Sequence, residues 1–328
     1  MTFNYKNVYL NETSTVCGPI EKEGPLKKYF DKTYDDLYGE EKSFEKAEIR
    51  YVKDAMVLLL RKSGLIKEEI DVVVGGDLLN QIAASTYGTC GVGKSFIGVY
   101  GACSSSVLGM IVASNFIEGN MVENAIVEVS SHNSASEKQF RNPVEYGTPK
   151  VDSATFTASG AAACLLSNEK SKVKVESATL GKIVDYQQND VNDMGRVMAP
   201  AAYETLKSHF EETGRNPDYY DLILTGDLGC FGKEILTEYM RESGYILDNY
   251  NDCGTMLYDL ETQKEVHAGG SGPVCSALVN FGYIYDELKK KKLKKVLLVA
   301  TGALFSPTTV HQGEDIYSIA HAISLEVV

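Results

Sequence analysis

The chain has 328 residues, of which 44% are hydrophobic and 23% are charged, so it can bury a large core as one big domain or as two fused halves. Its formal net charge of -13 repels nucleic acids and anionic lipid surfaces at long range, and neither is expected as a default partner. No charged and then apolar leader opens the sequence, and no uncharged apolar run approaches the roughly 20 residues that cross a bilayer. Any membrane role is therefore expected to be peripheral.

Seven cysteines are spread along the chain without a CxxC pair. Because an odd number cannot form a complete set of intrachain disulfides, they are expected to be the thiols of a cytosolic protein. The spacing gives no reason to expect zinc. No metal and no cofactor is predicted.

The first predicted unit is a helix that leads into a buried strand. The helix is predicted by apolar residues spaced three or four apart, namely Phe44, Val52, Met56, Leu59 and Leu60. It is expected to end near a glycine, Gly64, before the short apolar run at residues 72–74, which predicts a strand. The unit closes with Gly76 and Asp77.

A glycine-led helix follows between two strands. Residues 95–100, SFIGVY, predict a strand, and the next residues, GACSSS, place Cys103 at the start of an apolar helix. Two further strands are predicted at residues 125–131 and 161–167.

The second half of the chain repeats this pattern. Residues 63–79 and 213–229 match without a gap at an offset of 150, with far more identities than the roughly one expected by chance. Before the second copy, a helix is predicted from Tyr203, Leu206 and Phe210. The matched residues Gly64, Asp71, Gly76, Asp77 and Leu78 reappear as Gly214, Asp221, Gly226, Asp227 and Leu228.

Later elements recur in the same order with a larger offset, which the polar stretch at residues 245–264 is expected to absorb. They are a glycine-led helix from Gly269 and strands at residues 296–302 and 322–328. Because each half alternates helices and strands, a mostly parallel sheet covered by helices is expected.

Two such halves that share a layer of helices give the five-layered αβαβα arrangement of the thiolase-like fold, a duplicated α/β fold, which is the predicted architecture. The N-terminal half is placed at residues 1–168 and the C-terminal half at residues 169–328. Two separate doubly wound domains are the alternative. They would need an exposed linker, whereas the boundary segment NEKSKVK is short and runs straight into an apparent strand.

Cys103 marks the candidate site. In thiolases and ketoacyl synthases the nucleophilic cysteine occupies the corresponding helix start, where N–H groups and the helix dipole favour thiolate and bound anions. The alternative is a small packing residue at a tight helix start. The surrounding repeat favours a site.

The groups that would activate this cysteine are not found. Catalysis on this fold also needs a base and an oxyanion partner from the second half. Where ketoacyl synthases carry a histidine, this chain has Gly226 and Asp227, and the glycine-rich segment from Ala268 contains neither asparagine nor histidine. His267 is the one candidate for a substitute base, but a misplacement by one turn would spoil proton transfer, so a strand-ending role is favoured. The chain is therefore predicted not to be an enzyme.

Asp77 and Asp227 follow their strands at the carboxyl edge, where open α/β sheets place ligands. Capping of the next helix is the favoured role for Asp227. For Asp77 capping and ligand contact are evenly balanced, because Asn80 and Gln81 add polar groups at the same edge.

The segment SSHNSASEKQFRNPVEYG from Ser130 is dense in hydrogen-bond donors for an acidic protein. His132 can donate to an anion, and Arg141 can grip a carboxylate with two bonds. Because the segment leaves a core strand beside the cysteine helix, a site role is favoured for both residues over a solvated loop, whereas Lys138 is expected to be solvated. Core or surface positions are expected for the histidines without a surrounding motif, His209, His311 and His321.

The chain closely resembles the stage V sporulation protein AD family, thiolase-like proteins of endospore formers, nearly from end to end. The motifs that carry the resemblance are GPIEKEGPLKKYFDKTYDD from Gly18, GGDLLNQ from Gly75, GACSSS, SSHNSASEKQFRNPVEYG, DMGRVMAPAAYETLK from Asp193, TGDL at Thr225, NDCG at Asn251, AGGSG at Ala268 and VATGALFSPT from Val299.

The resemblance implies a non-catalytic protein that binds dipicolinic acid (pyridine-2,6-dicarboxylate), alone or as its calcium chelate. It implies a cytoplasmic, peripheral place on the inner membrane of the developing spore, with membrane-embedded stage V A subunits as partners in moving dipicolinate into the spore and releasing it in germination. A homodimer is also expected. The candidate ligand contacts are Asp77, Asn80, Cys103, Ser104, His132, Asn133, Arg141, Asp227 and Ser271.

In the hypothetical pose, one carboxylate of dipicolinate faces the helix start at Cys103 and Ser104. The other meets Arg141 or His132, and Asp77 or Asn80 contacts the ring nitrogen or a calcium ion. Two other functions are kept as alternatives: a condensing-type acyltransferase that uses Cys103 as nucleophile, and a structural adaptor of the same complex.

Overall fold

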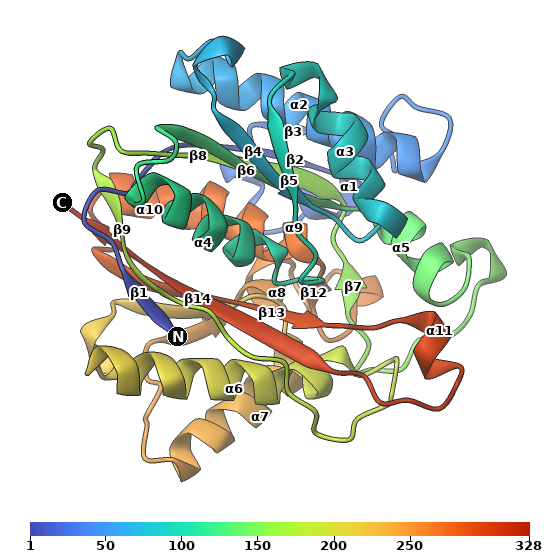
Figure 1. Cartoon of the computed structure of the whole chain (residues 1–328). Helices are drawn as coiled ribbons and strands as arrows, with labels where there is room; N and C mark the ends of the chain where they lie inside the picture. The colour runs from blue at the N-terminus through green and yellow to red at the C-terminus, as the bar shows by residue number, and fades with distance from the viewer.

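Five layers of helices and strands are stacked in the computed structural model, which describes all residues 1–328. Figure 1 shows α2 (Phe44–Ser63) and α3 (Ala83–Thr89) on one outer side and α6 (Met194–Thr213) and α7 (Gly229–Glu242) on the other. The helix α4 (Ser105–Glu118) lies in the middle, between two layers of strands. The predicted αβαβα arrangement is confirmed.

The two layers of strands have the same internal order and meet at one seam. The hydrogen-bonded order is β11-β10-β13-β14-β9-β2-β8-β6-β4-β5, and the seam is the short pairing of β2 with β9, Tyr9 with Lys174 and Leu10 with Val173. The first half supplies β2 (Tyr9–Cys17), β4 (Val72–Gly76), β5 (Ser95–Gly98), β6 (Asn124–Ser131) and β8 (Gly160–Ser167). The second supplies β9 (Val173–Thr179), β10 (Leu222–Thr225), β11 (Tyr250–Asp252), β13 (Lys295–Ala303) and β14 (Ser318–Val327).

The shorter elements complete the layers and the rim of the fold. Strands β1 (Thr2–Asn4) and β3 (Lys32–Thr33) pair with β9 and β2, and β7 (Phe156–Thr157) pairs with β12 (Gly270–Ser271). The remaining helices are α1 (Pro19–Lys22), α5 (Asn133–Phe140), α8 (Cys253–Leu257), α9 (Pro273–Leu278), a π-helical stretch at Val279–Ile284, α10 (Tyr285–Lys289) and α11 (Pro307–Val310).

One detail of the predicted repeat needs correction. The polar stretch at residues 245–264 is not merely inserted material, because it contains β11, which pairs in parallel with β10 as β5 pairs with β4. Too few apolar residues follow one another there to predict a strand.

The repeated glycines and aspartates perform the same local tasks in both halves. Gly64 and Gly214 end α2 and α6 with φ of 75° and 68°, a left-handed conformation that glycine adopts at little cost. Asp71 accepts hydrogen bonds from the backbone N–H groups of Glu123 and Asn124. Asp221 does the same for Lys294 and Lys295. Each aspartate therefore ties the start of one strand to its parallel neighbour.

The central helix α4 is apolar on nearly all sides because both of its faces are covered. It packs against β4 and β6 of one half and against β13 and β14 of the other. Its fully buried side chains include Val107, Met110, Ile111 and Ile117. A helix that is hydrophobic all round is buried in the core of a large domain, and this one fixes its first turn between the two halves.

A cluster of three buried carboxyl groups lies beneath α2. Glu48 of α2, Glu128 of β6 and Asp77 after β4 are each 0% exposed. Glu48 accepts a hydrogen bond from Ser130 Oγ, but its other oxygen and both oxygens of Glu128 have no partner. Burial and the neighbouring carboxyls raise the pKa of Glu48 and Glu128 well above the usual value, which favours their protonated forms.

Candidate functional site

A two-part cavity opens at the carboxyl edge of the parallel strands. The inner pocket has a volume of about 50 Å³ and contains Cys103 and Ser271 in its wall. It adjoins an outer chamber of about 540 Å³. Phe140, Arg141 and Phe305 line both spaces, so a ligand in the chamber reaches the pocket past these three side chains.

The turn that carries Cys103 is held in a strained backbone conformation. Ala102 has φ of 49°, which is uncommon for a residue with a Cβ. Ser104 Oγ donates to Gly101 O at 2.6 Å and Ser105 Oγ donates to Ala102 O at 2.7 Å, and these bonds fix the turn. The thiol of Cys103 is thereby presented to the inner pocket at the start of α4.

A serine and a carboxyl group, rather than a base, stand opposite the thiol. Cys103 Sγ lies 3.8 Å from Ser271 Oγ, which donates to Asp227 Oδ2 at 3.0 Å. Asp227 also accepts from Gly272 N at 3.1 Å and from Thr301 Oγ1 at 2.6 Å. Burial and the Asp227 carboxyl raise the pKa of the Cys103 thiol well above its usual value. The thiol is therefore protonated at neutral pH and is a poor nucleophile.

The favoured capping role of Asp227 is wrong. The turn into α7 is held by Asp252, whose carboxylate accepts from Leu228 N at 2.9 Å and Gly229 N at 3.0 Å. Asp227 is left to face the Cys103 side of the fold, where it orients Ser271. The role of Asp252 was not predicted because this residue ends β11, a strand that was itself not predicted.

No histidine lines the inner pocket. His267 is half-buried, and it lines neither the pocket nor the outer chamber. Its backbone has φ of 50° and bridges to Thr155. The geometry therefore places it at the end of a turn and outside the lining of both spaces.

The helix α5 carries two polar groups without hydrogen-bond partners at residues that line the cavity. Asn133 is 6% exposed and lines the outer chamber, and its Nδ2 has no hydrogen-bond partner. Ser136 is 1% exposed and lines the inner pocket, and its Oγ also has no partner. Buried donors are rarely left unsatisfied in native proteins, because each costs about 1–3 kcal/mol. Both atoms have less than 1 Å² of accessible surface, so they are unsatisfied groups enclosed beside the cavity wall.

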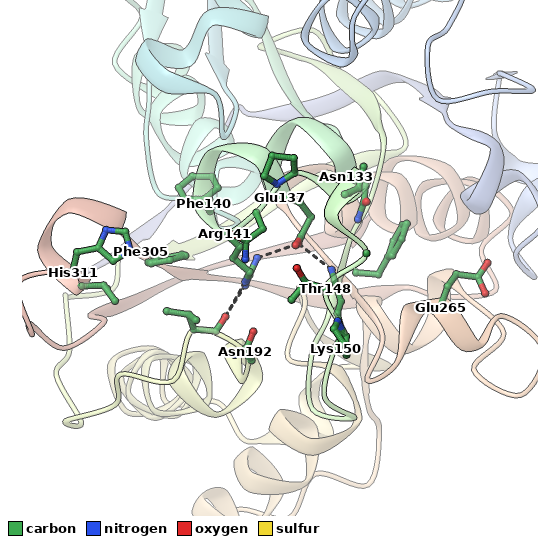
Figure 2. Close-up of a pocket in the computed structure, with 18 residues that line it drawn as sticks. Asn133, Glu137, Phe140, Arg141, Thr148, Lys150, Asn192, Glu265, Phe305 and His311 are labelled. Carbon is green, nitrogen blue, oxygen red and sulfur yellow. Dashed lines mark hydrogen bonds and ion pairs between the residues drawn. The ribbon is translucent and has the colours of Figure 1, made fainter.

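Two cationic side chains form ion pairs with the same glutamate at the chamber wall (Figure 2). Arg141 Nη1 lies 3.2 Å and Lys150 Nζ lies 3.1 Å from Glu137 Oε1. Arg141 also donates through Nε and Nη2 to Val191 O at 3.0 and 2.8 Å. These three bonds fix the guanidinium and leave two of its five N–H groups free. The pair carries one positive charge more than Glu137 neutralises.

Aromatic rings form the apolar part of the wall. The rings of Phe140 and Phe305 lie 5.6 Å apart, and the Arg141 guanidinium lies 5.8 Å from the centre of the Phe305 ring. His311 is exposed and lines the same chamber (Figure 2). A flat, anionic molecule therefore finds apolar surface and hydrogen-bond donors side by side.

Five of the nine predicted contacts belong to this cavity. Four of them line the cavity, namely Cys103, Ser271, Arg141 and Asn133. The fifth, Asp227, accepts a hydrogen bond from Ser271. The others do not reach it.

His132 is one of the predicted contacts that lie elsewhere. It is 0% exposed, its Nε2 lies 2.7 Å from Leu37 O, and its ring stacks between Phe44 and Tyr51. Burial lowers its pKa to about 4, so the ring is neutral at pH 7 and offers no cation.

Asp77, Asn80 and Ser104 also lie outside the cavity lining. Asp77 accepts from Leu79 N at 2.7 Å and Ser85 N at 2.8 Å, which is the capping role. Asn80 is exposed. Ser104 is buried, and its hydroxyl and its N–H both bond to Gly101 O. It therefore has no free donor for a carboxylate at this helix start.

Several residues of the cavity lining were not predicted from the sequence. Ser136 and Phe140 became recognisable only when residues 133–140 formed a helix whose first five residues are buried. Lys150, Phe305 and His311 come from loops far apart in the chain, and only the fold brings them together. No signal in the sequence distinguishes them from ordinary surface residues.

Two further properties bear on the function. No group of three or more histidine, cysteine or acidic side chains is arranged to hold a metal ion. None of the helices combines the length and the apolar character needed to cross a membrane.

Comparison with solved structures finds the same fold in other proteins. A 3-oxoacyl-[acyl-carrier-protein] synthase III from Aquifex aeolicus VF5 is 12% identical, with a TM-score of 0.59 and coverage of 97% of this chain and 99% of the other. OleA from Xanthomonas campestris is 14% identical, with a TM-score of 0.64 and coverage of 99% of each chain. At such identities the similarity shows the thiolase-like fold alone.

Comparison of sequences identifies the family. The family model described as stage V sporulation protein AD (SpoVAD) matches residues 1–326. Stage V sporulation protein AD of Bacillus subtilis (strain 168) is 43% identical over 320 residues, which cover 97% of this chain and 94% of that protein. The chain therefore belongs to the stage V sporulation protein AD family.

Proposed function

We propose that this protein binds dipicolinate in the two-part cavity, without chemical turnover, as a peripheral subunit of the sporulation machinery that moves dipicolinate. The observation that carries the proposal is the composition of the cavity wall. Unpartnered donors at Asn133 and Ser136 stand beside two cations, Arg141 and Lys150, and a pair of aromatic rings.

The volumes and donors favour the outer chamber for the ring of the ligand. The inner pocket of about 50 Å³ has room for roughly three to five water molecules, enough for one carboxylate. The chamber of about 540 Å³ admits the pyridine ring beside Phe140 and Phe305. In this pose one carboxylate meets Ser136, and the other meets Arg141, Lys150 and Asn133. The pose replaces the predicted contacts at Ser104 and His132.

The surroundings of the thiol support a binding role over catalysis. Cys103 faces Ser271 and Asp227, which raises the pKa of the thiol, and no histidine of the pocket wall can take its proton. Acyl transfer needs a thiolate and a proton-transfer partner within about 3 Å. The raised pKa of the thiol and the absence of a histidine from the pocket wall support the proposal that Cys103 acts as part of the wall.

A condensing-type acyltransferase is the second candidate, and one observation favours it. Cys103 is presented from a strained turn at a helix start, as a nucleophile would be, in a fold shared with acyl-transferring synthases. Covalent acylation of Cys103 by acyl-coenzyme A, seen by mass spectrometry of the intact protein and followed by release of product, would favour this candidate over the binding role.

Isothermal titration calorimetry tests the binding role. Dipicolinate is titrated into the wild type with and without calcium, which tells the free dianion from the chelate. Arg141→Gln removes the charge while keeping a polar side chain, and at least a tenfold loss of affinity is expected from the lost charge-assisted bonds. Lys138→Gln on the same helix is the matched control, because Lys138 pairs with Glu45 outside the chamber. Equal affinities for both variants would remove Arg141 from the site, and no heat with the wild type would refute the function.

The proposed partners are the membrane-embedded stage V A subunits and a second copy of this chain. The edge strand β5 is largely exposed, with Phe96 and Tyr100 37% and 48% exposed beside it. An open edge of this kind pairs readily with another strand. Sedimentation equilibrium of the wild type, compared with a Phe96→Glu variant, tests the homodimer.

A further inference from the structure

A lysine-rich face lies at the end of the molecule opposite the cavity. Residues 286–295, DELKKKKLKK, contain six lysines and two acidic residues, and residues 168–174, NEKSKVK, contain three lysines and one acidic residue. These two short segments thus carry a local excess of positive charge in a chain of net charge -13. The two segments together hold nine of the 32 lysines and arginines of the chain.

The fold joins the two segments into one surface. The C-terminal strand β14 lies between them, since Val327 N donates to Lys294 O and Val328 N donates to Lys172 O. A hollow of about 570 Å³ beside them is lined by four lysines, by two glutamates and by serine hydroxyls; the charged residues are Lys62, Lys170, Lys172, Lys289, Glu12 and Glu169.

Several of these lysines are free to bind a partner. Lys290 and Lys292 pair with Asp286 and Glu287 on their own helix turn. Four other lysines of this face are exposed and make no ion pair, namely Lys170, Lys172, Lys291 and Lys294.

The face and the cavity are separated by the length of the sheet. Lys295 begins β13, and Ala303, at its end, lines the inner pocket. Nine residues of strand at about 3.3 Å each span nearly 30 Å. In Figure 1, α10 and the C terminus lie at the left end of the molecule and α11 lies at the right.

We propose that this lysine face docks on an anionic lipid surface and holds the cavity open toward the aqueous side. The proposal rests on the proposed peripheral role and adds the surface that performs it. Exposed lysine clusters of four to eight residues are attracted to anionic headgroups, each lysine strengthening binding about fivefold. Charges farther than about 10 Å are screened at moderate salt, so the acidic remainder of the chain does not cancel this attraction once the face is turned to the membrane.

Vesicle co-sedimentation of the full-length protein tests the proposal. The probes are vesicles of phosphatidylcholine alone and vesicles with about one third phosphatidylglycerol, at low salt and at about 0.5 M salt. The test variant reverses the four free lysines, Lys170→Glu, Lys172→Glu, Lys291→Glu and Lys294→Glu. The matched control reverses four exposed lysines outside the face that also make no ion pair, Lys27→Glu, Lys42→Glu, Lys46→Glu and Lys53→Glu.

The proposal expects the wild type to bind only the anionic vesicles and to dissociate at high salt. The test variant loses binding by on the order of a hundredfold, and the control changes it severalfold at most. Failure of the wild type to bind anionic vesicles, equal binding to neutral ones, or equal losses in both variants would overturn the proposal. So would tighter, lysine-face-dependent binding to duplex DNA than to the vesicles. Dipicolinate titration of the test variant is expected to match the wild type, so failure at the membrane and failure of ligand binding are separate results.

Discussion

Replacing the buried carboxyl of Glu128 by an amide should stabilise the protein at neutral pH. Glu128 is fully buried, neither of its oxygens has a hydrogen-bond partner, and its pKa is raised well above the usual value by burial and by Asp77. In the unfolded chain this carboxyl ionises near pH 4.5. Above that pH, ionisation favours the unfolded state by about 1.4 kcal/mol per pH unit until the folded protein also releases the proton.

The direction of this pKa shift decides how the stability penalty depends on pH. A raised folded pKa means that the penalty is absent below pH 4.5 and grows as the pH rises toward the folded pKa. At pH 7 the penalty grows with the raised folded pKa to a limit of about 3 kcal/mol. Glu128→Gln removes the ionisable group, so the free energy of unfolding should rise by up to about 3 kcal/mol at pH 7 and change little at pH 4.5.

Urea unfolding followed by circular dichroism, from pH 4.5 to pH 8, measures this difference. Glu314→Gln is the control, because Glu314 is exposed and makes no ion pair, and it should leave the unfolding free energy nearly unchanged. A Glu128→Gln variant that is less stable than the wild type at pH 7, or whose difference from the wild type does not vary with pH, would refute the reasoning.

Three further predictions concern the thiol, the helix packing and the turn at His267. Asp227→Asn removes the carboxyl that raises the pKa of the Cys103 thiol. Alkylation of this thiol by iodoacetamide at pH 8 should therefore be about tenfold faster for each unit by which its pKa falls. An unchanged rate in a variant with native circular dichroism would contradict this. Gly195→Ala would put a Cβ 2.2 Å from Leu228 O and should cost about 2–3 kcal/mol in urea unfolding, whereas Gly91→Ala, with no atom within 4 Å, should cost little. His267→Gln should leave calorimetric dipicolinate affinity within twofold of the wild type, and a larger loss would return His267 to the site.

Much of the fold could be predicted because the same sequence pattern occurs in both halves of the chain. Helix periodicity, a terminal glycine and a short apolar strand occur together before Asp77 and again before Asp227, and a repeat at one offset is hard to produce by chance. The apolar sequence of α4 fitted a helix covered on both sides. The strand β11 was missed because its three residues, Tyr250–Asp252, are stabilised by pairing with β10 and not by their own composition.

The site was predicted less completely because its residues depend on orientation. Cys103 and Arg141 stood in recognisable motifs, and the cavity contains both. His132 stood in the same motif, but it begins α5 with its ring turned into the core. A rotation of about 100° per residue along a helix decides which side chain faces a cavity, and no residue type reveals that rotation by itself. Ser136 was overlooked for the same reason.

The duplicated aspartates show how copies of one segment acquire separate duties. Asp71 and Asp221 still fasten neighbouring strands in the same way. Asp77 and Asp227 have diverged: one closes a local turn, and the other sits opposite the thiol. The two halves are consequently no longer interchangeable. A chimera of two N-terminal halves would keep the aspartate hydrogen bonds that join neighbouring strands. It would lack the carboxyl that faces Cys103 and one wall of the cavity.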